Sequence, residues 1–359
     1  MNGKINLCVL FGGQSPEHKI SCKSAASVIH NLHIDRYNLQ TIGITKEGAW
    51  YLYTGDVENI AEDSWEEDTQ NLKRAFICPD ACEKAIYVFE ESGAYTKIYP
   101  DVVFPVLHGE HGEDGTMQGL LELANLKYVG TGVPASANCM DKTFTKILLK
   151  DAGIPQAEWV TIHTNAMDRL AEKVAEIESK LGYPCFVKPA TTGSSVGVGK
   201  AYNREQLESA IKEAAAYARK ILVEEHIDGR EVECSVLGNQ QPVAGEVGEI
   251  MPTVDFYDFD AKYNDNTTKL QIPAQIPEGI REQIRQYALD AFVAVDGSGL
   301  SRVDFFIRNS DGTVVINEIN TMPGFTNISM YPKLWEAVGL KYADLLDQLI
   351  LLALEGNKQ

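Results

Sequence analysis

Residues 301–320 read SRVDFFIRNSDGTVVINEIN, two apolar runs interspersed with polar side chains and joined by Asp311-Gly312. Asp-Gly between two such runs is typical of a β-hairpin turn. Because successive side chains of a strand point to opposite faces, Val303, Phe305 and Ile307 share one face. The polar side chains predicted to leave that face are Arg302 and Asp304 in the first strand and Glu318 and Asn320 in the second. The stretch therefore predicts an antiparallel hairpin with acids and an amide near one end.

The register of this hairpin decides whether Asp304 and Glu318 meet. They stand opposite each other if the loop holds an odd number of residues, for example Ser310–Gly312 with Gly312 at positive φ. A two-residue Asp-Gly turn would put the two carboxylates on opposite faces unless a β-bulge corrected the register. Alternation also places Ile316 on the face of Glu318.

Two acids on one sheet face repel each other unless a cation joins them, and Asn320 adds an amide oxygen. Oxygen-only ligands of this kind favour Mg²⁺ that bridges phosphates. The competing interpretation is a pair of solvated strand ends, with Asp304 and Glu318 bound to lysines. The residues alone leave both interpretations open.

A glycine-rich stretch, GSSVGVGK at residues 193–200, resembles a P-loop but departs from it twice. Ser194 stands where a P-loop needs its first glycine, and Ala201 has no hydroxyl for Mg²⁺. Lys188 precedes this stretch inside the apolar strand CFVKP. An unpaired charge there would be costly, so Lys188 is expected to have an anionic partner.

The first 130 or so residues alternate strand and helix. The run Ile5–Gly13 predicts a buried parallel strand, and Ser15-Pro16 predicts an N-cap followed by a first helical turn. Asp56–Asp68 is expected to be acidic surface, and Asp101–Gly109 a further strand. This pattern predicts a Rossmann-like sheet, in which ligands sit beyond the carboxyl ends of strands.

The rest of the chain is read in the same way. Gly130–Cys139 is expected to be hinge-like, and the following helix to be capped by Asp141 and to end at Gly153. Helices and strands alternate to about Tyr217, and the last third is richer in strands. A helix over Tyr342–Leu354 is predicted to close the fold.

Composition excludes several classes of protein. The 359 residues include 44% hydrophobic and 23% charged residues, typical of a globular chain large enough for two or three domains. A net charge of −19 argues against a nucleic-acid or anionic-membrane binder. No apolar run approaches the ~20 residues of a membrane span. Seven cysteines and the lack of a signal-peptide pattern lead us to expect reduced thiols in the cytoplasm.

Several motifs together resemble the D-alanine–D-alanine ligases of the ATP-grasp superfamily. They are FGGQSPEHKIS near the start, HGEHGEDGTMQG at 108–119, VKPATTGSSVGVGK at 187–200 and NEINTMPGFTNISMYPKLW at 317–335. The resemblance implies an α/β fold, α+β in its C-terminal part, with three domains. These are a Rossmann-like domain at 1–138, a central subdomain with a glycine-rich lid at 139–222, and a C-terminal subdomain at 223–359. ATP is expected between the last two.

The resemblance also implies the reaction. The γ-phosphate of ATP passes to the carboxylate of one D-alanine, and the amine of a second D-alanine attacks the acyl phosphate, which gives D-alanyl-D-alanine for peptidoglycan precursors. Asp304, Glu318 and Asn320 match the ligands of two Mg²⁺ ions, with Mn²⁺ as a possible substitute, and Glu318 bridging them. A homodimer is expected from the family.

Residues that match the nucleotide site fall into three groups. Lys142, Lys188 and Lys262 correspond to phosphate-contacting lysines. Glu224 and the backbone near Glu225 and Ile227 correspond to the adenine contacts, and Glu231 to the ribose contact. Ser195 belongs to the glycine-rich lid. Read without the resemblance, the lysines at 142 and 262 and the acids at 224 and 231 could equally be solvated.

Residues that match the amino-acid site come from both ends of the chain. Glu17 and His108 correspond to the seat of the first D-alanine, and Ser329 and Met330 to the pocket of the second. Arg302 and the backbone N–H of Gly324 correspond to the groups that stabilise the oxyanion. Helix-start electrostatics for Glu17, a structural histidine at 108 and a buried ion pair for Arg302 are the alternatives.

The resemblance turns the glycine-rich stretch into a lid between two strands. Ser194 would bond to Tyr263 and to Glu17, and so link three domains across the closed site. Lys200 then has no phosphate role and is expected to be solvated.

Other functions stay open at this point. Relatives that join D-alanine to D-serine or D-lactate share the fold, although Met330 is apolar where resistance-type ligases tend to carry arginine. A dinucleotide-binding oxidoreductase is disfavoured because FGGQSPE lacks the third glycine of that fingerprint. A non-catalytic nucleotide sensor is disfavoured because metal and oxyanion groups occur together.

Overall fold

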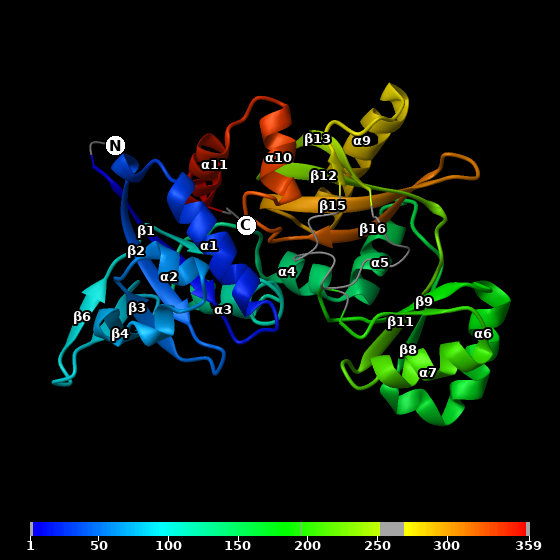
Figure 1. Ribbon diagram of the computed structural model, residues 1–359, viewed down its shortest axis with the longest axis horizontal. Helices are drawn as coiled ribbons and strands as arrows, with labels where there is room; N and C mark the ends of the chain where they lie inside the picture. Colours follow the sequence, from blue (N-terminus) through cyan, green and yellow to red (C-terminus); the bar gives the residue numbers. More distant parts are fainter. Residues whose placement is uncertain (1–2, 195, 252–268, 357–359) are drawn as a thin grey trace.

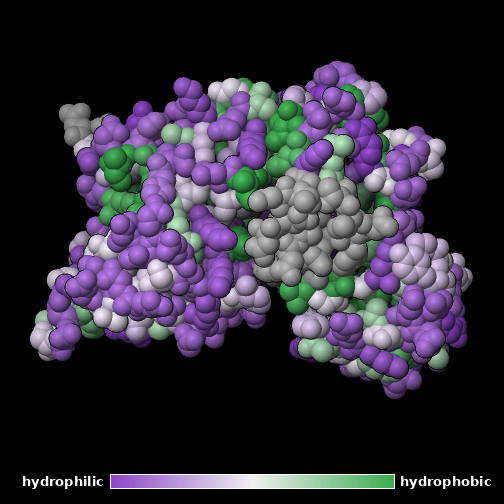
Figure 2. Space-filling view, viewed as in Figure 1, coloured by the Kyte–Doolittle hydropathy of each residue, from purple (hydrophilic) through white to green (hydrophobic). Residues whose placement is uncertain are grey.

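The computed structural model describes residues 3–194, 196–251 and 269–356, and they form three sheets with their covering helices (Figure 1). A seven-stranded sheet lies at one end of the molecule. A four-stranded and a five-stranded sheet lie at the other. Hydrophilic residues cover most of the coloured part of the face shown in Figure 2. None of the helices in the described ranges is long and apolar enough to cross a membrane.

The seven-stranded sheet has the order β6-β5-β4-β3-β2-β1-β7. Its strands are β1 (Ile5–Gly12), β2 (Tyr37–Ile44), β3 (Trp50–Tyr53), β4 (Leu72–Ile77), β5 (Ile86–Phe89), β6 (Tyr95–Ile98) and β7 (Val102–Pro105). β1 pairs in parallel with both β2 and β7, so their carboxyl ends meet at one edge. The predicted Rossmann-like parallel core is confirmed for these three strands. The other four add an antiparallel extension that no long apolar run indicated.

The first helix begins later than predicted. α1 spans His18–Asn31, with Glu17 at the N-cap position, whereas the sequence suggested Ser15. The hydroxyl of Ser15 accepts a hydrogen bond from the backbone N–H of Glu17 at 3.1 Å, and the carbonyl of Ser15 accepts one from His18. Ser15 therefore forms a turn before the helix, and this turn brings Glu17 to the helix start.

The acidic stretch Asp56–Asp68 is only partly surface. It forms α2 (Val57–Ala61) and a short 3₁₀ helix (Trp65–Glu67), and both bury one large apolar side chain. Ile60 is 1% exposed, and Trp65 is fully buried against the ring of Phe11. The prediction of a surface stretch therefore holds for exposed acids such as Glu58, Glu62 and Glu67, but it missed the two buried apolar anchors.

Two helices cover the segment after β7. α3 spans Thr116–Leu123 and buries Met117 and Leu121. The segment predicted as a hinge instead forms α4 (Val133–Met140), with Gly132 at its N-cap and Pro134 in its first turn. Proline lacks an N–H, and the first turn of a helix is where that absence costs nothing, so the prediction of a hinge was wrong.

The four-stranded sheet is antiparallel, with the order β10-β9-β11-β8. Its strands are β8 (Trp159–His163), β9 (Cys185–Pro189), β10 (Gly199–Ala201) and β11 (Lys220–Glu225). α6 (Leu170–Lys180) and α7 (Arg204–Ala214) pack on it, preceded by a 3₁₀ helix at Thr164–Arg169. The glycine-rich stretch joins β9 to β10, so it connects two strands, as predicted, and does not lead into a helix.

The five-stranded sheet is also antiparallel, with the order β14-β13-β12-β15-β16. Its strands are β12 (Gly229–Gly238), β13 (Val243–Met251), β14 (Lys269–Gln271), β15 (Gly299–Arg308) and β16 (Val314–Asn320). α9 (Glu278–Ala294) packs on its core face, and α10 (Met330–Ala337) and α11 (Tyr342–Glu355) follow β16. Two further 3₁₀ turns lie at Ile34–Arg36 and Thr69–Asn71.

A β-bulge sets the register of the β15–β16 hairpin. Phe305 pairs with Ile316, whereas Asp304 pairs with Glu318, so Asn317 is the extra residue. The bulge, and not an odd loop, therefore brings the two carboxylates opposite each other. Gly312 has a φ of +74°, as expected for the turn. The bulge also turns Ile316 into the core with Ile319, so the prediction that Ile316 shares the face of Glu318 was wrong.

The predicted domain limits stay predictions, but two elements bear on them. β11 runs through the proposed limit at 222 and belongs as a whole to the four-stranded sheet. α5 (Lys142–Asp151), capped by Asp141 as predicted, packs against α9 and β16 of the five-stranded sheet. The central segment is thus packed against the C-terminal one through α5.

Candidate active site

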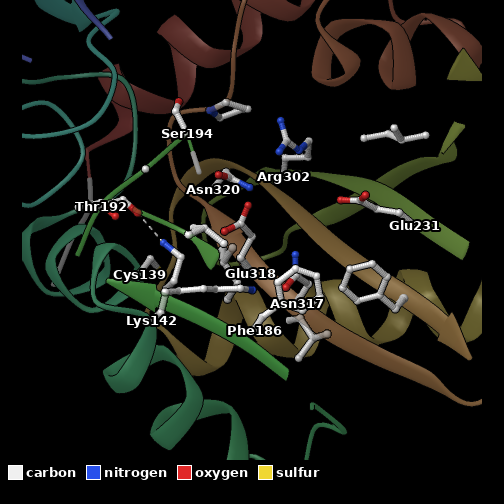
Figure 3. Close-up of a pocket in the computed structure, with 18 of the residues that line it drawn as sticks. Cys139, Lys142, Phe186, Thr192, Ser194, Glu231, Arg302, Asn317, Glu318 and Asn320 are labelled. Carbon is white, nitrogen blue, oxygen red and sulfur yellow. Dashed lines mark hydrogen bonds between the residues drawn. The ribbon is translucent and has the colours of Figure 1, made fainter. Parts of the chain in front are cut away.

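A cavity of about 630 Å³ lies where the three sheets meet, and Figure 3 shows side chains that enter it. Glu17, His108 and Gly109 line it from the N-terminal sheet, and Lys188 and Glu224 from the four-stranded sheet. The five-stranded sheet and the segment after it contribute Glu231, Arg302, Glu318, Asn320 and Gly324. Most of the predicted site residues therefore line one cavity, although Glu17 and Gly324 lie at opposite ends of the chain.

Arg302 is fixed between two buried carboxylates. Its Nε and Nη2 donate to the two oxygens of Asp304 at 2.7 Å each, and its Nε lies 2.9 Å from Oε2 of Glu233. Asp304 and Glu233 are each 2% exposed. Burial lowers the pKa of Arg302, but the two carboxylates raise it well above its ordinary value. The guanidinium is therefore a permanent, oriented positive charge at the cavity wall.

The oxygen donors at the ends of β15 and β16 fit a hard divalent cation by their chemistry. Glu318 and Asn320 line the cavity, and Asp304 lies opposite Glu318 in the ladder. The amide of Asn320 donates to Oδ2 of Asp304 at 3.0 Å. Asp304 therefore already serves Arg302 and Asn320, and an ion bound here would share it with the arginine.

Two lysines form ion pairs with Glu224, one with each oxygen of its carboxylate. Nζ of Lys188 lies 2.6 Å from Oε2 of Glu224, and Nζ of Lys146 lies 2.6 Å from Oε1. Burial raises the pKa of Glu224, but Lys188 and Lys146 together lower it to about 2. The anionic partner predicted for Lys188 is confirmed as this carboxylate. Lys142 lies nearby, and its Nζ donates to the carbonyl of Thr192 at 2.8 Å (Figure 3).

The segment that follows Glu224 forms a slot in which apolar and acidic side chains are mixed. Glu225, Ile227 and Glu231 all line the cavity together with the ring of Phe186. The carboxylate of Glu225 accepts from Nη2 of Arg308 at 2.6 Å and from the backbone N–H of Glu158 at 2.9 Å. Its side chain is therefore occupied, and its backbone N–H donates to the carbonyl of Glu158 at 3.0 Å.

Glu17 connects the N-terminal sheet to the glycine-rich stretch. The hydroxyl of Ser194 donates to Oε1 of Glu17, as predicted. A Cβ on Gly109 or on Gly193 would come within 2.5 Å or 2.9 Å, respectively, of Oε2 of Glu17. Because these two residues have no Cβ, the carboxylate of Glu17 has room between them.

His108 is buried beside Glu17, at 4% exposure. Its Nδ1 donates to the carbonyl of Met322 at 3.2 Å, and its Nε2 lies 3.0 Å from the hydroxyl of Ser24. The carboxylate of Glu113 lies 3.7 Å from Nδ1. The histidine has both a structural setting and a place on the cavity wall.

Of the other predicted site residues, Gly324 lines the cavity, whereas Ser329 and Met330 are not among its lining residues. The hydroxyl of Ser329 accepts from the backbone N–H of Thr326 at 3.0 Å, just before α10. Met330 is buried in a small apolar cluster with Ile250 and Leu334. Ser195, Lys262 and Tyr263 lie outside the described residues.

The sequence suggested that Lys200 is solvated, but the structure shows it only partly exposed. It is half-buried in β10, and its Nζ lies 5.4 Å from the ring centroids of both Phe186 and Tyr202. Two aromatic faces therefore receive this ammonium group.

Sequence reasoning missed four contributors: Lys146, Glu113, Glu233 and Asn317. Lys146 had a signal, because helical spacing puts it on the buried face of α5 with Thr143 and Leu149. Glu233 alternates along β12 toward the Arg302 face, but nothing in the sequence identified that strand as the neighbour of β15.

Known proteins match nearly the whole chain in sequence. The family described as "D-ala D-ala ligase N-terminus" matches residues 6–131, and "D-ala D-ala ligase C-terminus" matches residues 148–351. The D-alanine–D-alanine ligases of Acetivibrio thermocellus and Thermoanaerobacter sp. are each 50% identical to the chain. They cover 99% of it, over 97% and 98% of their own lengths. The chain belongs to the D-alanine–D-alanine ligase family.

Solved structures agree with membership of this ligase family. The VanG D-Ala:D-Ser ligase from Enterococcus faecalis superposes with a TM-score of 0.89 at 38% identity, covering 98% of this chain and 99% of its own. The D-alanine–D-alanine ligase from Coxiella burnetii superposes with a TM-score of 0.83, also at 38% identity, covering 98% of this chain and 96% of its own. The fold is therefore the mixed α/β ATP-grasp fold of these ligases, and the family is ATP-dependent.

Proposed function

We propose that this chain joins two D-alanine molecules into D-alanyl-D-alanine, with cleavage of ATP to ADP and phosphate. The observation that carries the proposal is the convergence of Arg302, Glu318, Asn320 and Glu17 on the cavity that Lys188 also lines. A site with a fixed cation, oxygen donors and a separate carboxylate suits a zwitterionic amino acid beside a polyphosphate. Relatives at 50% identity bear the name of this reaction.

ATP would lie between the four-stranded and five-stranded sheets. Lys142 and Lys188 would face its phosphates, the adenine would enter the slot beside Phe186 and Ile227, and Glu231 would meet the ribose. Asp304, Glu318 and Asn320 would hold two Mg²⁺ ions, or Mn²⁺. When bound, such ions neutralise phosphate charge during transfer. The lysines provide the part of this neutralisation that belongs to the chain itself.

The first D-alanine would lie between Glu17 and Arg302. Glu17 would accept the ammonium group, and Arg302 would attract the carboxylate, because the two residues carry opposite charges on opposite walls of the cavity. His108 would support the seat of Glu17. Holding the carboxylate near the γ-phosphate is the main physical task, since little else is needed for in-line transfer.

In the reaction, a carboxylate oxygen of the first D-alanine attacks the γ-phosphorus, and ADP leaves. The deprotonated amine of the second D-alanine then attacks the acyl carbon, and phosphate leaves with the oxygen that joined it. Arg302 and the backbone N–H of Gly324 would stabilise the oxyanion of the tetrahedral intermediate. Ser194, bound to Glu17, would help to hold the glycine-rich stretch over the site and exclude water.

The second substrate is the point at which a relative suggests an alternative. VanG joins D-alanine to D-serine and is similar to this chain over its whole length, but at 38% identity. Ser329 and Met330 are the candidates for the second-substrate pocket, and Met330 offers no polar atom beyond its thioether. We therefore favour D-alanine over D-serine and D-lactate. Competition among the three amines or alcohols, with dipeptide and depsipeptide products quantified, decides between them.

Glu318→Gln tests the proposed site. The change keeps the size of the side chain and removes a charge from the metal ligands, so D-alanine-dependent phosphate release should fall at least about a hundredfold. Glu172→Gln, at an exposed position of α6, is the matched control and should keep normal turnover. Near-normal turnover in a folded Glu318→Gln protein would contradict the assignment.

Three further properties belong to the same proposal. The chain would act in the cytoplasm, where ATP is available and the thiols stay reduced. All seven cysteines lie in described residues as free thiols, which supports this location. A homodimer and the division at residues 138 and 222 follow from the family and stay predictions.

A further inference from the structure

Lys146 is a buried lysine that does not line the cavity. Its side chain is 4% exposed, and its Nζ reaches Oε1 of Glu224 at 2.6 Å and the carbonyl of Ala157 at 3.2 Å. The ring of Trp159 lies 5.1 Å from the same ammonium group. A charge this far from water is costly unless it is paired. Glu224 is therefore the group that stabilises the buried charge of Lys146.

Lys188 shares the same carboxylate from the other side. Glu224 and Lys188 line the cavity, so Glu224 separates Lys146 from it. Two ammonium groups and one carboxylate leave the trio with one net positive charge. Without Lys146, Lys188 and Glu224 would form a neutral pair.

We propose that Lys146 is a positioning residue of the nucleotide site. It neutralises Glu224 from behind and fixes its orientation, and so leaves the positive charge of Lys188 available to the phosphates of ATP. The inference rests on the proposed function for the identity of its ligand. Lys146 acts through Glu224 and has no direct contact with ATP.

The geometry explains why one lysine is not enough. A carboxylate 2.6 Å from Lys188 competes with any phosphate for that ammonium group. In a water-poor site such competition is strong, because charges there interact in a low dielectric. A second ammonium group at the other oxygen of Glu224 weakens the hold of that carboxylate on Lys188.

Lys146→Met is the direct test, because methionine fills similar space without charge. The KM for ATP should rise at least about tenfold, while kcat falls less than about threefold, the pattern of lost ground-state binding. Lys150→Met is the matched control. It lies one turn further along α5, its Nζ is 5.6 Å from the same Trp159 ring, and it is exposed. Its KM and kcat should stay within about twofold of wild type.

A double-mutant cycle separates charge from packing. Binding of a non-hydrolysable ATP analogue with Mg²⁺ is measured by calorimetry for wild type, Lys146→Met, Glu224→Gln and the double variant. Once Glu224 has lost its charge, no carboxylate competes with the phosphates for the ammonium group of Lys188. The loss of affinity caused by Lys146→Met should therefore be at least about fivefold smaller in the Glu224→Gln background.

Several outcomes would overturn the proposal: wild-type affinity in Lys146→Met, an equal loss in both backgrounds, or no binding of the analogue to wild type. Thermal unfolding reports whether each variant is folded. If Lys146→Met does not fold, Lys146→Gln, which keeps a donor but no charge, replaces it with the same expectations. The binding assay contains no D-alanine. A wild-type protein that binds the analogue but makes no dipeptide would therefore contradict the proposed function and leave this inference standing.

Discussion

His108 joins the segment after β7 to the segment after β16. Through Nδ1 it donates to the carbonyl of Met322, and Glu113 lies on the same side of the ring. Burial lowers the pKa of His108, but Glu113, and then Glu17, raise it above its ordinary value. A histidine with a raised pKa stabilises the fold below its unfolded-state pKa, and this contribution is lost as the pH rises through the folded-state pKa.

Glu113→Gln should lower the pKa of His108, because it removes the carboxylate that raises that pKa most. Glutamine still accepts a hydrogen bond from the backbone N–H of Gly109, so the loop geometry is kept. The loss of unfolding free energy should be larger near pH 6 than at a pH above the folded-state pKa of His108, where the ring is neutral in both proteins. NMR titration of His108 and denaturant unfolding at both pH values test this. A loss that does not depend on pH would contradict it.

The partner of a single residue could be predicted in kind where the neighbouring sequence showed that the residue is buried. Lys188 stands in an apolar strand, so its need for an anion followed from its neighbours. Lys146 and Glu113 lie in segments with mixed polarity, and their partners come from other elements. Only the tertiary fold shows that Glu224 and His108 are those partners.

At the scale of elements, the β15–β16 hairpin depends on one inserted residue. Asn317 shifts the ladder by one position, which brings Glu318 opposite Asp304 and sends Ile316 into the core. The sequence predicted the hairpin, and a β-bulge was one of two ways in which the register could be set. It could not place the bulge, because alternation alone fits either register.

The loop after β7 gives a second test at this scale. Gly109 has a φ of +73°, and a Cβ there would lie 2.5 Å from Oε2 of Glu17 and 2.8 Å from Oγ of Ser15. Gly109→Ala should displace the Glu17 carboxylate and raise the KM for the first D-alanine roughly ten- to a hundredfold. Steady-state kinetics in D-alanine measures this change.

Gly153→Ala is the control for backbone strain. Gly153 has a φ of +72°, and nothing lies within 4 Å of a Cβ built there. Both variants should lose about 1–2 kcal/mol of stability from the left-handed backbone, but only Gly109→Ala should change the KM. Equal KM values in the two variants would show that Gly109 does not make room for Glu17.

Element prediction failed mainly where segments are short or their apolar residues small. β3, β5 and β6 have four residues each and are partly exposed, so no long apolar run marked them. α9 was missed although Ile284, Ala288 and Ala291 recur at helical spacing. Alanines give little contrast with the polar residues around them, and this hid the pattern.

At the scale of the whole molecule, one apolar core joins the two ends of the chain. Phe104 of β7 packs against Phe325, and Leu345 and Leu349 of α11 belong to the same cluster as Val9 of β1. Figure 1 shows α11 between the N-terminal sheet and the five-stranded sheet. The wall that carries Glu17 and the wall that carries Arg302 are therefore held in fixed relation.

Asp347 of α11 is the polar part of this joint. It is 6% exposed and accepts from Nδ1 of His33 at 2.8 Å, from Arg36 and from the hydroxyl of Tyr37. Asp347→Ala should lower the free energy of unfolding by about 2–3 kcal/mol, because the buried hydroxyl of Tyr37 and the more exposed His33 and Arg36 lose their shared acceptor. Denaturant unfolding measures the change. Asp344→Ala, exposed on the same helix, should cost less than about 1 kcal/mol, and equal losses would contradict the role of Asp347.

The resemblance of motifs predicted the fold and the gathering of site residues better than composition or periodicity did. It could not show that α11 packs into the N-terminal core, because the contacts of a helix depend on which sheets surround it. Nor could it show the pairing of Lys146 with Glu224, which requires α5 and β11 to be adjacent.

The central claim is that the carboxylate of D-alanine takes the γ-phosphate of ATP before the peptide bond forms. The most direct measurement uses D-alanine labelled with ¹⁸O in its carboxylate, with mass analysis of the released phosphate. The account predicts that each phosphate released with a molecule of D-alanyl-D-alanine carries one ¹⁸O atom from the acid. Dipeptide formation with unlabelled phosphate would contradict it.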